Sequence, residues 1–351
     1  MRVAVAQVLL RFDDERHWLR AAAGRIGHLF PRLLRQSEYN ARLKGLAPLM
    51  EAALRWLADH TPGSAEMVRL MDATPVPCGH SVITARRSGL AGWAGYGYCP
   101  SHSRWYRGSK LLIICTCDGT VTGFGLANPK LYGEREQARQ VLRHQPANRP
   151  APGTAVVTDK GPSREGTETF FAGDDLRLAL IRPARKDEQA PRYFPNWLRQ
   201  RVEAIIWTLK NQLGLERHGG RTPAGLWARI VQRLLALNAC IWHNWATGAP
   251  VKRSLIAYDH FLAAMSARAT RGRHANVLQH AFGHVSRHLG RSRRADLVAR
   301  VDAYRRGTDP LSVPVAILGH YASDGELPWL AGQTYLDPFP AALRLRHSVP
   351  R

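Results

Sequence analysis

The stretch Thr154-Ala155-Val156-Val157-Thr158-Asp159 places a carboxylate directly after a short run of apolar and β-branched residues. A run of this length and composition predicts a buried β-strand. Asp72 has the same position in Met67-Val68-Arg69-Leu70-Met71-Asp72. The two stretches therefore predict a sheet in which two strands each end at an aspartate. Taken alone, either aspartate is typical of a turn or a helix N-cap.

The residues around these stretches predict an α/β fold with a mixed sheet. From about residue 66 to 183 the apolar pattern is mostly that of strands, and Asp118-Gly119 between two of them is typical of a hairpin turn. This makes Asp118 a turn residue rather than a metal ligand. The expected strands are 106–116, 121–126, 153–158 and 178–181, and the expected helices are 134–142, 197–215 and 223–245.

The two ends of the chain are expected to be helical. Apolar residues recur at three- and four-residue steps in residues 1–60, with arginines in the gaps. Two interpretations stay open: a basic DNA-binding region, or the solvated face of helices that pack on a core. The chain begins inside the pattern without an N-cap residue, so we expect a truncated N-terminus. Near the other end, helices are expected at 274–289 and 292–306, followed by a proline-rich tail.

The charge balance favours a polyanionic partner. The 351 residues contain 50 Lys and Arg against 27 Asp and Glu, a net charge of +23. Such a surplus is typical of proteins that bind nucleic acid or an anionic membrane surface. No apolar run approaches the roughly 20 residues that a membrane span requires. Five widely spaced cysteines favour a reducing compartment. We therefore expect a cytoplasmic protein that binds a polyanion.

A third acid, Glu203, lies in the expected helix 197–215. Arg199 precedes it by four residues and Lys210 follows it by seven. From Arg199 to Lys210 a helix makes about three full turns at roughly 3.6 residues per turn, so all three residues are expected on one stripe. An ion pair with Arg199 is the simpler role for Glu203. The alternative is that Asp72, Asp159 and Glu203 converge on a pair of divalent cations, the arrangement that drives in-line phosphoryl transfer.

The chain resembles DDE-type insertion-sequence transposases, which have an RNase H-like core, over about residues 3–257. The residues that carry the resemblance are Leu70-Met71-Asp72-Ala73-Thr74-Pro75-Val76-Pro77, Val156-Val157-Thr158-Asp159-Lys160-Gly161, Arg199-x3-Glu203-x6-Lys210, Asn128, Leu180-Ile181-Arg182-Pro183 and Leu235-Ala236-Leu237-Asn238-Ala239-x-Ile241-Trp242. The fold implied is a mixed five-stranded sheet flanked by helices. The chain departs from the family pattern at Asn196, where the family has a tyrosine, and at Pro162, where an aromatic residue is common. Both departures favour an inactive copy.

The resemblance also implies a chemistry. Asp72, Asp159 and Glu203 would be the catalytic residues and would hold two Mg²⁺ ions, for which Mn²⁺ can substitute. The reaction implied is cleavage of double-stranded DNA at the ends of an insertion sequence, followed by strand transfer into target DNA. The active complex is expected to be a homodimer, and the resemblance implies a bacterial, nucleoid-associated protein. The residues expected to bind DNA are Arg199, Lys210, Lys160 and Arg182.

From about residue 258 the chain resembles the YbgA-like domain of unknown function. The residues that carry this second resemblance are His274-Ala275-Asn276-Val277-Leu278-Gln279-His280, Tyr304-Arg305-x-Gly307, Pro310-Leu311-x-Val313-Pro314 and Gln333-Thr334-Tyr335-Leu336-Asp337-Pro338-Phe339-Pro340. Three parts are then expected: a helical region at 1–65 that is a candidate for DNA binding, a catalytic domain at 66–257 and a mainly helical, partial YbgA-like domain at 258–351. An accidental fusion is the favoured origin. The alternatives are a catalytically inactive chimeric nucleic-acid-binding protein, or an RNA-modification accessory whose C-terminal module binds RNA.

Two cysteines and two histidines between the first aspartate and the next expected strand are candidate zinc ligands. They are Cys78, His80, Cys99 and His102. Their spacing matches no common zinc finger, and the glycines and aromatic residues between them are typical of a packed loop. A packed loop is therefore the favoured interpretation.

Overall fold

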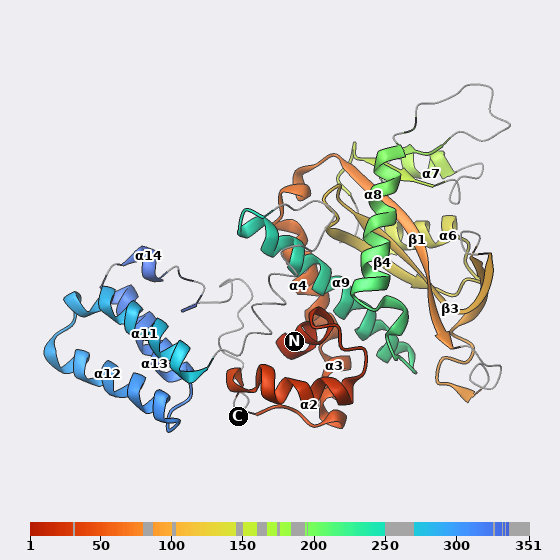
Figure 1. Ribbon diagram of the computed structural model, residues 1–351. Helices are drawn as coiled ribbons and strands as arrows, with labels where there is room; N and C mark the ends of the chain where they lie inside the picture. Colours follow the sequence, from red (N-terminus) through yellow and green to blue (C-terminus); the bar gives the residue numbers. More distant parts are fainter. Residues whose placement is uncertain are drawn as a thin grey trace. The chain divides into compact units, whose positions relative to one another are not determined.

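The computed structural model describes residues 1–336 with gaps at 31, 80–86, 100–102, 145–149, 160–166, 174–175, 184–193, 195, 250–269, 326, 332 and 334. The chain forms two compact units (Figure 1). Unit 1 comprises Met1–Leu19 and Leu34–Leu262, and unit 2 comprises Arg20–Leu33 and Ala263–Arg351. Within the described ranges, no helix has both the length and the apolar character needed to cross a bilayer. The three-part division expected from the sequence stays a prediction.

A six-stranded mixed sheet forms the centre of unit 1. The strands are β1 (Val68–Gly79), β2 (Gly95–Cys99), β3 (Arg104–Cys115), β4 (Val121–Ala127), β5 (Ala155–Thr158) and β6 (Ala179–Ile181). β3 pairs antiparallel with β1, β2 and β4. β5 and β6 extend the sheet beyond β1 as parallel strands. Antiparallel strands on one side of β1 and parallel strands on the other form an α/β, RNase H-like sheet, which confirms the predicted fold class.

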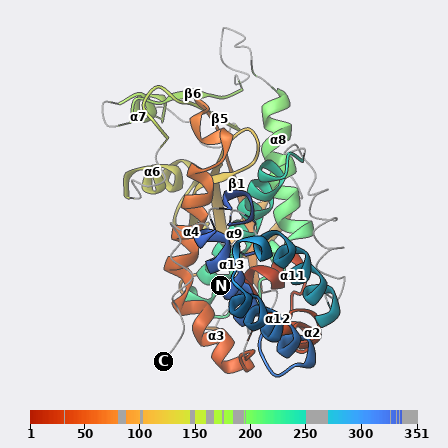
Figure 2. The ribbon, with the colours of Figure 1, turned by 90° about the vertical axis from the view of Figure 1, so that its left-hand side faces the viewer.

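Helices cover both faces of this sheet. They are α6 (Glu134–His144) and α7 (Thr167–Ala172) on one face, and α8 (Asn196–Trp207) and α9 (Pro223–Ala246) on the other (Figure 2). Met71 and Phe171 belong to the buried apolar cluster under α6 and α7. Because side chains alternate along a strand, Leu70 and Asp72 point to the opposite face, where α8 packs on β1.

β1 is longer than the sequence pattern predicted. It continues to Gly79, so Asp72 lies inside the strand, and the prediction that it ends a strand was wrong. Pro75 and Pro77 concealed the extension, because proline lacks the N–H that a central strand needs. β5 pairs with β1 only from Val68 to Met71, and no other described strand pairs on that side of β1. Proline is tolerated there because no ladder hydrogen bond is lost.

Two neighbouring segments test the strand predictions further. β2 occupies part of the segment that was expected to be a packed loop, so that expectation was wrong. The hairpin between β3 and β4 forms as predicted. Asp118 accepts hydrogen bonds from the N–H and the hydroxyl of Thr120, at 3.0 and 2.9 Å. Gly119 has a φ of 100°, in the region that favours glycine. Asp118 is therefore a turn residue.

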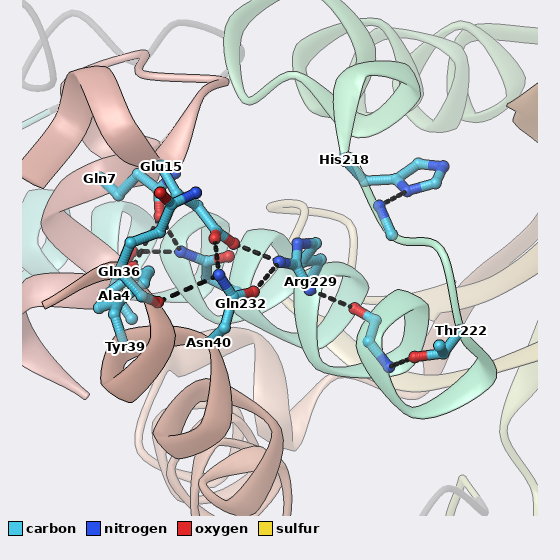
Figure 3. Close-up of polar contacts among 12 residues, drawn as sticks. Ala4, Gln7, Glu15, Gln36, Tyr39, Asn40, His218, Thr222, Arg229 and Gln232 are labelled. Atoms are coloured by element: carbon cyan, nitrogen blue, oxygen red, sulfur yellow. Dashed lines mark hydrogen bonds and ion pairs between the residues drawn. The ribbon is translucent and has the colours of Figure 1, made fainter. Parts of the chain in front are cut away.

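The N-terminal helices of unit 1 pack on α9. They are α1 (Arg2–Leu9), the start of α2 (Glu15–Arg25), α3 (Gln36–Gly45) and α4 (Ala47–Asp59). Arg229 of α9 forms an ion pair with Glu15 and donates to Oδ1 of Asn40 at 2.6 Å (Figure 3). Gln232, one turn further along α9, donates to the carbonyl of Ala4 at 2.6 Å. These buried polar contacts join the helical N-terminal region to α9, which itself packs on β4 of the sheet.

Asn238 of α9 forms a further buried polar contact, which joins α9 to the start of β4 and to α4. Its Oδ1 accepts from the Val121 N–H at 2.8 Å, and its Nδ2 donates to the Val121 carbonyl at 2.8 Å. Nδ2 also donates to the Leu54 carbonyl on α4, at 3.2 Å. The Asn238 side chain is fully buried, so it satisfies backbone groups that would otherwise be buried without partners.

His218 lies at the exit from the α8 region and is held in its neutral form. Nδ1 accepts from the Gly220 N–H at 2.9 Å, and Nε2 donates to the Pro77 carbonyl at 2.9 Å. Burial lowers the pKa of His218 to about 4. A proton would be taken up by the unfolded histidine, whose pKa is about 6.5, before the folded one.

We expect the free energy of unfolding to fall as the pH drops below about 6.5, by roughly 3 kcal/mol from this residue by pH 4. Urea unfolding at neutral and acidic pH checks this. His218→Gln, which does not titrate in this range, should lose that part of the pH dependence. An unchanged pH dependence in His218→Gln would contradict the assignment.

Unit 2 is helical, as expected for the C-terminal region. Its helices are α11 (Arg271–Val285), α12 (Arg291–Arg306), α13 (Ser312–Asp324) and α14 (Pro328–Ala331). Leu278, Leu297 and Leu318 belong to its buried core. The expectation of a proline-rich tail after residue 306 was wrong for the described part. Pro314 and Pro328 lie in the first turns of α13 and α14, where a backbone N–H has no helical partner to lose.

Candidate functional site

Strand pairing places Asp72 and Asp159 side by side. β1 and β5 run parallel, with Met71 opposite Thr158. The next residue on each strand path is one of the two aspartates, so both carboxylates lie at the point where β5 ends. Oδ1 of Asp72 accepts a hydrogen bond from the Ala73 N–H at 2.7 Å. Both aspartates are partly buried, and the Asp159 side chain keeps 44% of its surface exposed.

α8 brings Glu203 to the same place. Leu198, Val202 and Ile205 recur at helical spacing and are buried, so this side of α8 packs on β1 and β5. Glu203 projects from the border of that apolar side. Together with Arg199 and the two aspartates it lines one small cavity, whose apolar wall includes Leu70 and Val157. The structure therefore brings together the three acids that the sequence marked as candidates.

The electrostatics of this cavity are those of crowded negative charge. Burial is the main cause that raises the pKa of Asp72 to about 7, and the nearby carboxylates of Glu134, Asp159 and Glu203 raise it further. Arg199 partly compensates, since its Nε lies 3.1 Å from a Glu203 oxygen and its NH2 lies 3.8 Å from an Asp159 oxygen. The positively charged guanidinium of Arg199 therefore pairs with two of the three acids, Asp159 and Glu203.

The donor set fits a hard divalent cation. All the candidate ligands are carboxylate oxygens, which Mg²⁺ prefers. In the described part of the chain, no three Asp, Glu, His or Cys side chains already have the spacing of a metal site. Glu203 and Asp159 keep 55% and 44% of their side-chain surface exposed, which leaves both side chains room to rotate towards Asp72.

Comparison with known proteins is consistent with this geometry. Residues 63–239, half of the chain, match the family model described as "Transposase DDE domain". The chain belongs to this transposase family. Residues 246–340 match the family model described as "Protein of unknown function (DUF1722)".

The C-terminal match extends to a curated relative. Over 75 residues the chain is 40% identical to the uncharacterized protein YbgA of Escherichia coli strain K12, which is 21% of this chain and 44% of that protein. The chain thus spans less than half the length of this relative. No solved structure matches the chain significantly. The chain therefore joins a transposase domain to a YbgA-like domain, as the sequence resemblance indicated.

The structure gives acidic partners to three of the four residues expected to bind DNA in the transposase. Lys210 forms an ion pair with Glu216, Nζ to Oε1 at 3.0 Å. Arg182 forms an ion pair with Glu168 at 3.0 Å. Arg199 bridges Asp159 and Glu203, and Lys160 lies outside the described residues. Their roles in DNA binding stay predictions.

The expected single stripe of Arg199, Glu203 and Lys210 does not continue as a regular α-helix. Residues Thr208–Gln212 form a π-helical segment. A π-turn holds more residues than the roughly 3.6 of an α-turn, so it changes the direction in which Lys210 points. This segment turns Lys210 towards Glu216. Nothing in the sequence indicated that the α-helix would change to a π-helix at this point.

Glu134 is a nearby acid that the sequence did not single out. It lies in the first turn of α6, forms an ion pair with Lys110 at 3.1 Å, and contributes to the raised pKa of Asp72. Nothing in its local sequence places it near β1, because the approach depends on how α6 packs on the sheet.

The candidate zinc ligands are only partly described. Cys78 lies near the end of β1 and Cys99 at the end of β2, while His80 and His102 lie outside the described residues. Burial raises the pKa of the Cys78 thiol to about 11, which disfavours the thiolate that binds metal. Zinc binding by this group stays a prediction.

Proposed function

We propose that unit 1 is a DNA transposase that cuts double-stranded DNA at the ends of an insertion sequence and joins the cut strand to target DNA. The observation that carries this proposal is the cavity shared by Asp72, Asp159 and Glu203, with Arg199 between two of them. A structural ion-pair network would not need a third carboxylate whose pKa is raised by burial and, to a smaller extent, by its acidic neighbours.

Asp72, Asp159 and Glu203 would hold two Mg²⁺ ions. When bound, the ions supply activation of the attacking oxygen and stabilisation of the leaving oxygen in an in-line displacement. Asp72 forms the fixed side of the site, because β1 and the Ala73 N–H hold its carboxylate. Asp159 and Glu203 form the adjustable side. Arg199, released from those two carboxylates, can bind a DNA phosphate through two parallel hydrogen bonds.

We expect cleavage to depend on a divalent cation. The substrate for the test is a duplex that carries the DNA bordering this coding sequence in its genome, where the element's ends would lie. Cleaved product should appear with Mg²⁺, disappear with excess EDTA, and return when Mg²⁺ or Mn²⁺ is added in excess over the chelator. Cleavage that persists in EDTA would contradict the proposed role of the three acids.

DNA binding without cleavage under every metal condition would instead favour the alternative of an inactive chimeric nucleic-acid-binding protein. Asn196 and Pro162 are the residues where the chain departs from the family pattern, and they are the first positions to revert in that case. A homodimeric active complex remains a prediction, which sedimentation of the protein with bound DNA would check. RNA binding by unit 2 also remains a prediction, and loss of RNA binding when the YbgA-like residues are removed would support it.

A further inference from the structure

Three large aromatic side chains are exposed on the hairpin formed by β2 and β3. Tyr96 and Tyr98 of β2 are 51% and 46% exposed, and Trp105 of β3 is 72% exposed. Tyr98 and Trp105 are paired across the two strands, and their ring centroids are 5.3 Å apart. We call Tyr96, Tyr98 and Trp105 the aromatic ribbon. An exposed group of aromatic rings of this kind marks a binding surface more often than a single exposed residue does.

The local structure makes β2 present its tyrosines outward. Tyrosine alternates with glycine along the strand, and the glycines are buried. A Cβ on Gly97 would lie 2.8 Å from the Tyr106 ring and 2.9 Å from Pro129. Only glycine therefore allows β2 to lie flat on Tyr106. Because side chains alternate along a strand, the rings of Tyr96 and Tyr98 must point to the open side.

The charge around the ribbon complements a polyanion. The sequence from residue 73 to 117 contains five Arg or Lys residues and no Asp or Glu. Arg104, the neighbour of Trp105, has a half-exposed side chain, and its NH2 lies 3.6 Å from Glu216. Glu216, which comes from outside this segment, is therefore the acid that the structure places beside Arg104. Of the five cations in the segment, Arg107 is buried and Lys110 pairs with Glu134, so Arg104 is the one that the structure places beside the rings with an accessible side chain. A nucleic acid would find Arg104 for a phosphate and the rings for its bases.

The ribbon is linked to the candidate site through Glu216. One Glu216 oxygen pairs with Arg104 and the other pairs with Lys210 at 3.0 Å. Lys210 follows the end of α8, where Trp207 is 56% exposed, one helical turn beyond Glu203. Glu216 thus connects Arg104, next to the ribbon, with Lys210, which lies seven residues after Glu203 and has a mostly buried side chain.

We propose that the aromatic ribbon binds unpaired nucleotides of the DNA substrate by stacking bases on Tyr98 and Trp105, while Arg104 contacts the adjacent phosphate. The proposal rests on the proposed DNA-cleaving function. Ring stacking requires a free base face, and inside a duplex both faces of each base are covered by neighbouring bases. The ribbon therefore binds a single-stranded extension or a distorted duplex end in preference to a fully paired duplex. This orients the strand that leads to the three acids.

The test measures binding of two dye-labelled DNAs by fluorescence anisotropy, in EDTA so that no cleavage occurs. One DNA is a blunt duplex and the other is the same duplex with a short single-stranded extension. The variant is Tyr98→Ala with Trp105→Ala in the full-length chain. Stacking is worth about 1–3 kcal/mol per base, so binding of the extended duplex should weaken roughly 10- to 100-fold. Binding of the blunt duplex should change by less than about 2-fold.

Two control variants test whether the loss of affinity depends on the rings of Tyr98 and Trp105. Trp245→Ala removes an exposed indole from the end of α9 and should leave both affinities unchanged. Tyr98→Phe with Trp105→Phe keeps the ring faces and should restore binding of the extended duplex. Thermal unfolding of each variant confirms that the surface substitutions leave unit 1 folded.

The outcomes separate this proposal from the proposed function, because the assay does not involve the three acids. Equal loss for both DNAs, or no loss for either, would overturn the stacking role even if cleavage is later demonstrated. Loss of self-association with unchanged DNA affinity would assign the ribbon to an interface between copies of the chain and would also overturn it. Selective loss for the extended duplex supports the proposal even in an inactive copy.

Discussion

Asp72→Asn is expected to lower DNA cleavage by roughly 10³-fold or more, because the loss of a shared metal ligand costs several kcal/mol of transition-state stabilisation. Asparagine has the size of aspartate and still accepts the hydrogen bond from the Ala73 N–H. It lacks the negative charge that holds a divalent cation. Asp159→Asn and Glu203→Gln should have effects of similar size. Rates of end cleavage with Mg²⁺, measured under single-turnover conditions, give the comparison.

The same substitution should not destabilise the fold. The Asp72 carboxylate is desolvated and lies near three other acids, so its charged form is costly in the metal-free protein. Removing that charge should leave the free energy of unfolding unchanged or raise it. A catalytic role therefore predicts lost cleavage together with retained or increased stability, whereas a purely structural role predicts lost stability.

The control for these variants is Glu136→Gln, a partly exposed acid in the first turn of α6. It should leave both cleavage and stability unchanged, and duplex affinity should be similar in all four proteins. Should Asp72→Asn cleave as fast as Glu136→Gln, or should both lose activity alike, the assignment of the three acids fails.

Removing one partner of the Glu15–Arg229 ion pair is expected to have the largest effect on stability. Both side chains are about nine-tenths buried, and Arg229 also donates to Asn40 and to the Gly225 carbonyl. Glu15→Ala leaves the guanidinium buried without its carboxylate, and breaking a buried pair in this way costs about 3–5 kcal/mol. The contact joins the start of α2 to α9, so its loss should loosen the N-terminal helices from the sheet.

Urea unfolding followed by tryptophan fluorescence measures this effect in unit 1, which contains nine of the ten tryptophans. Arg55→Ala is the matched control, because the Arg55–Glu51 pair is more exposed and such pairs contribute about 0–1 kcal/mol. Replacing both Glu15 and Arg229 by apolar residues should cost much less than Glu15→Ala alone. A similar loss in Glu15→Ala and Arg55→Ala would contradict the importance assigned to the buried pair.

The fold and the candidate site differ in how far the sequence could predict them. The hairpin at Asp118-Gly119 and the long helix α9 follow from local patterns, and both form as predicted. β1 was cut short at Asp72 because Pro75 and Pro77 have an intrinsic preference against strands. That preference was outweighed by pairing with β3, a partner more than 30 residues away in the sequence.

What the sequence alone determined is local: the period of apolar residues, the turn chemistry, the surplus of positive charge and the identity of the three candidate acids. Such features act over a few residues and are readable because backbone preference and side-chain alternation are local properties. Only the tertiary structure decided that Asp72, Asp159 and Glu203 share a cavity. The same is true of the π-helical segment that turns Lys210 towards Glu216. It is also true of the close packing of the β2 glycines, which leaves the β2 tyrosines facing outward. Each of these depends on strand register and helix packing, which are set by contacts between residues far apart in the chain.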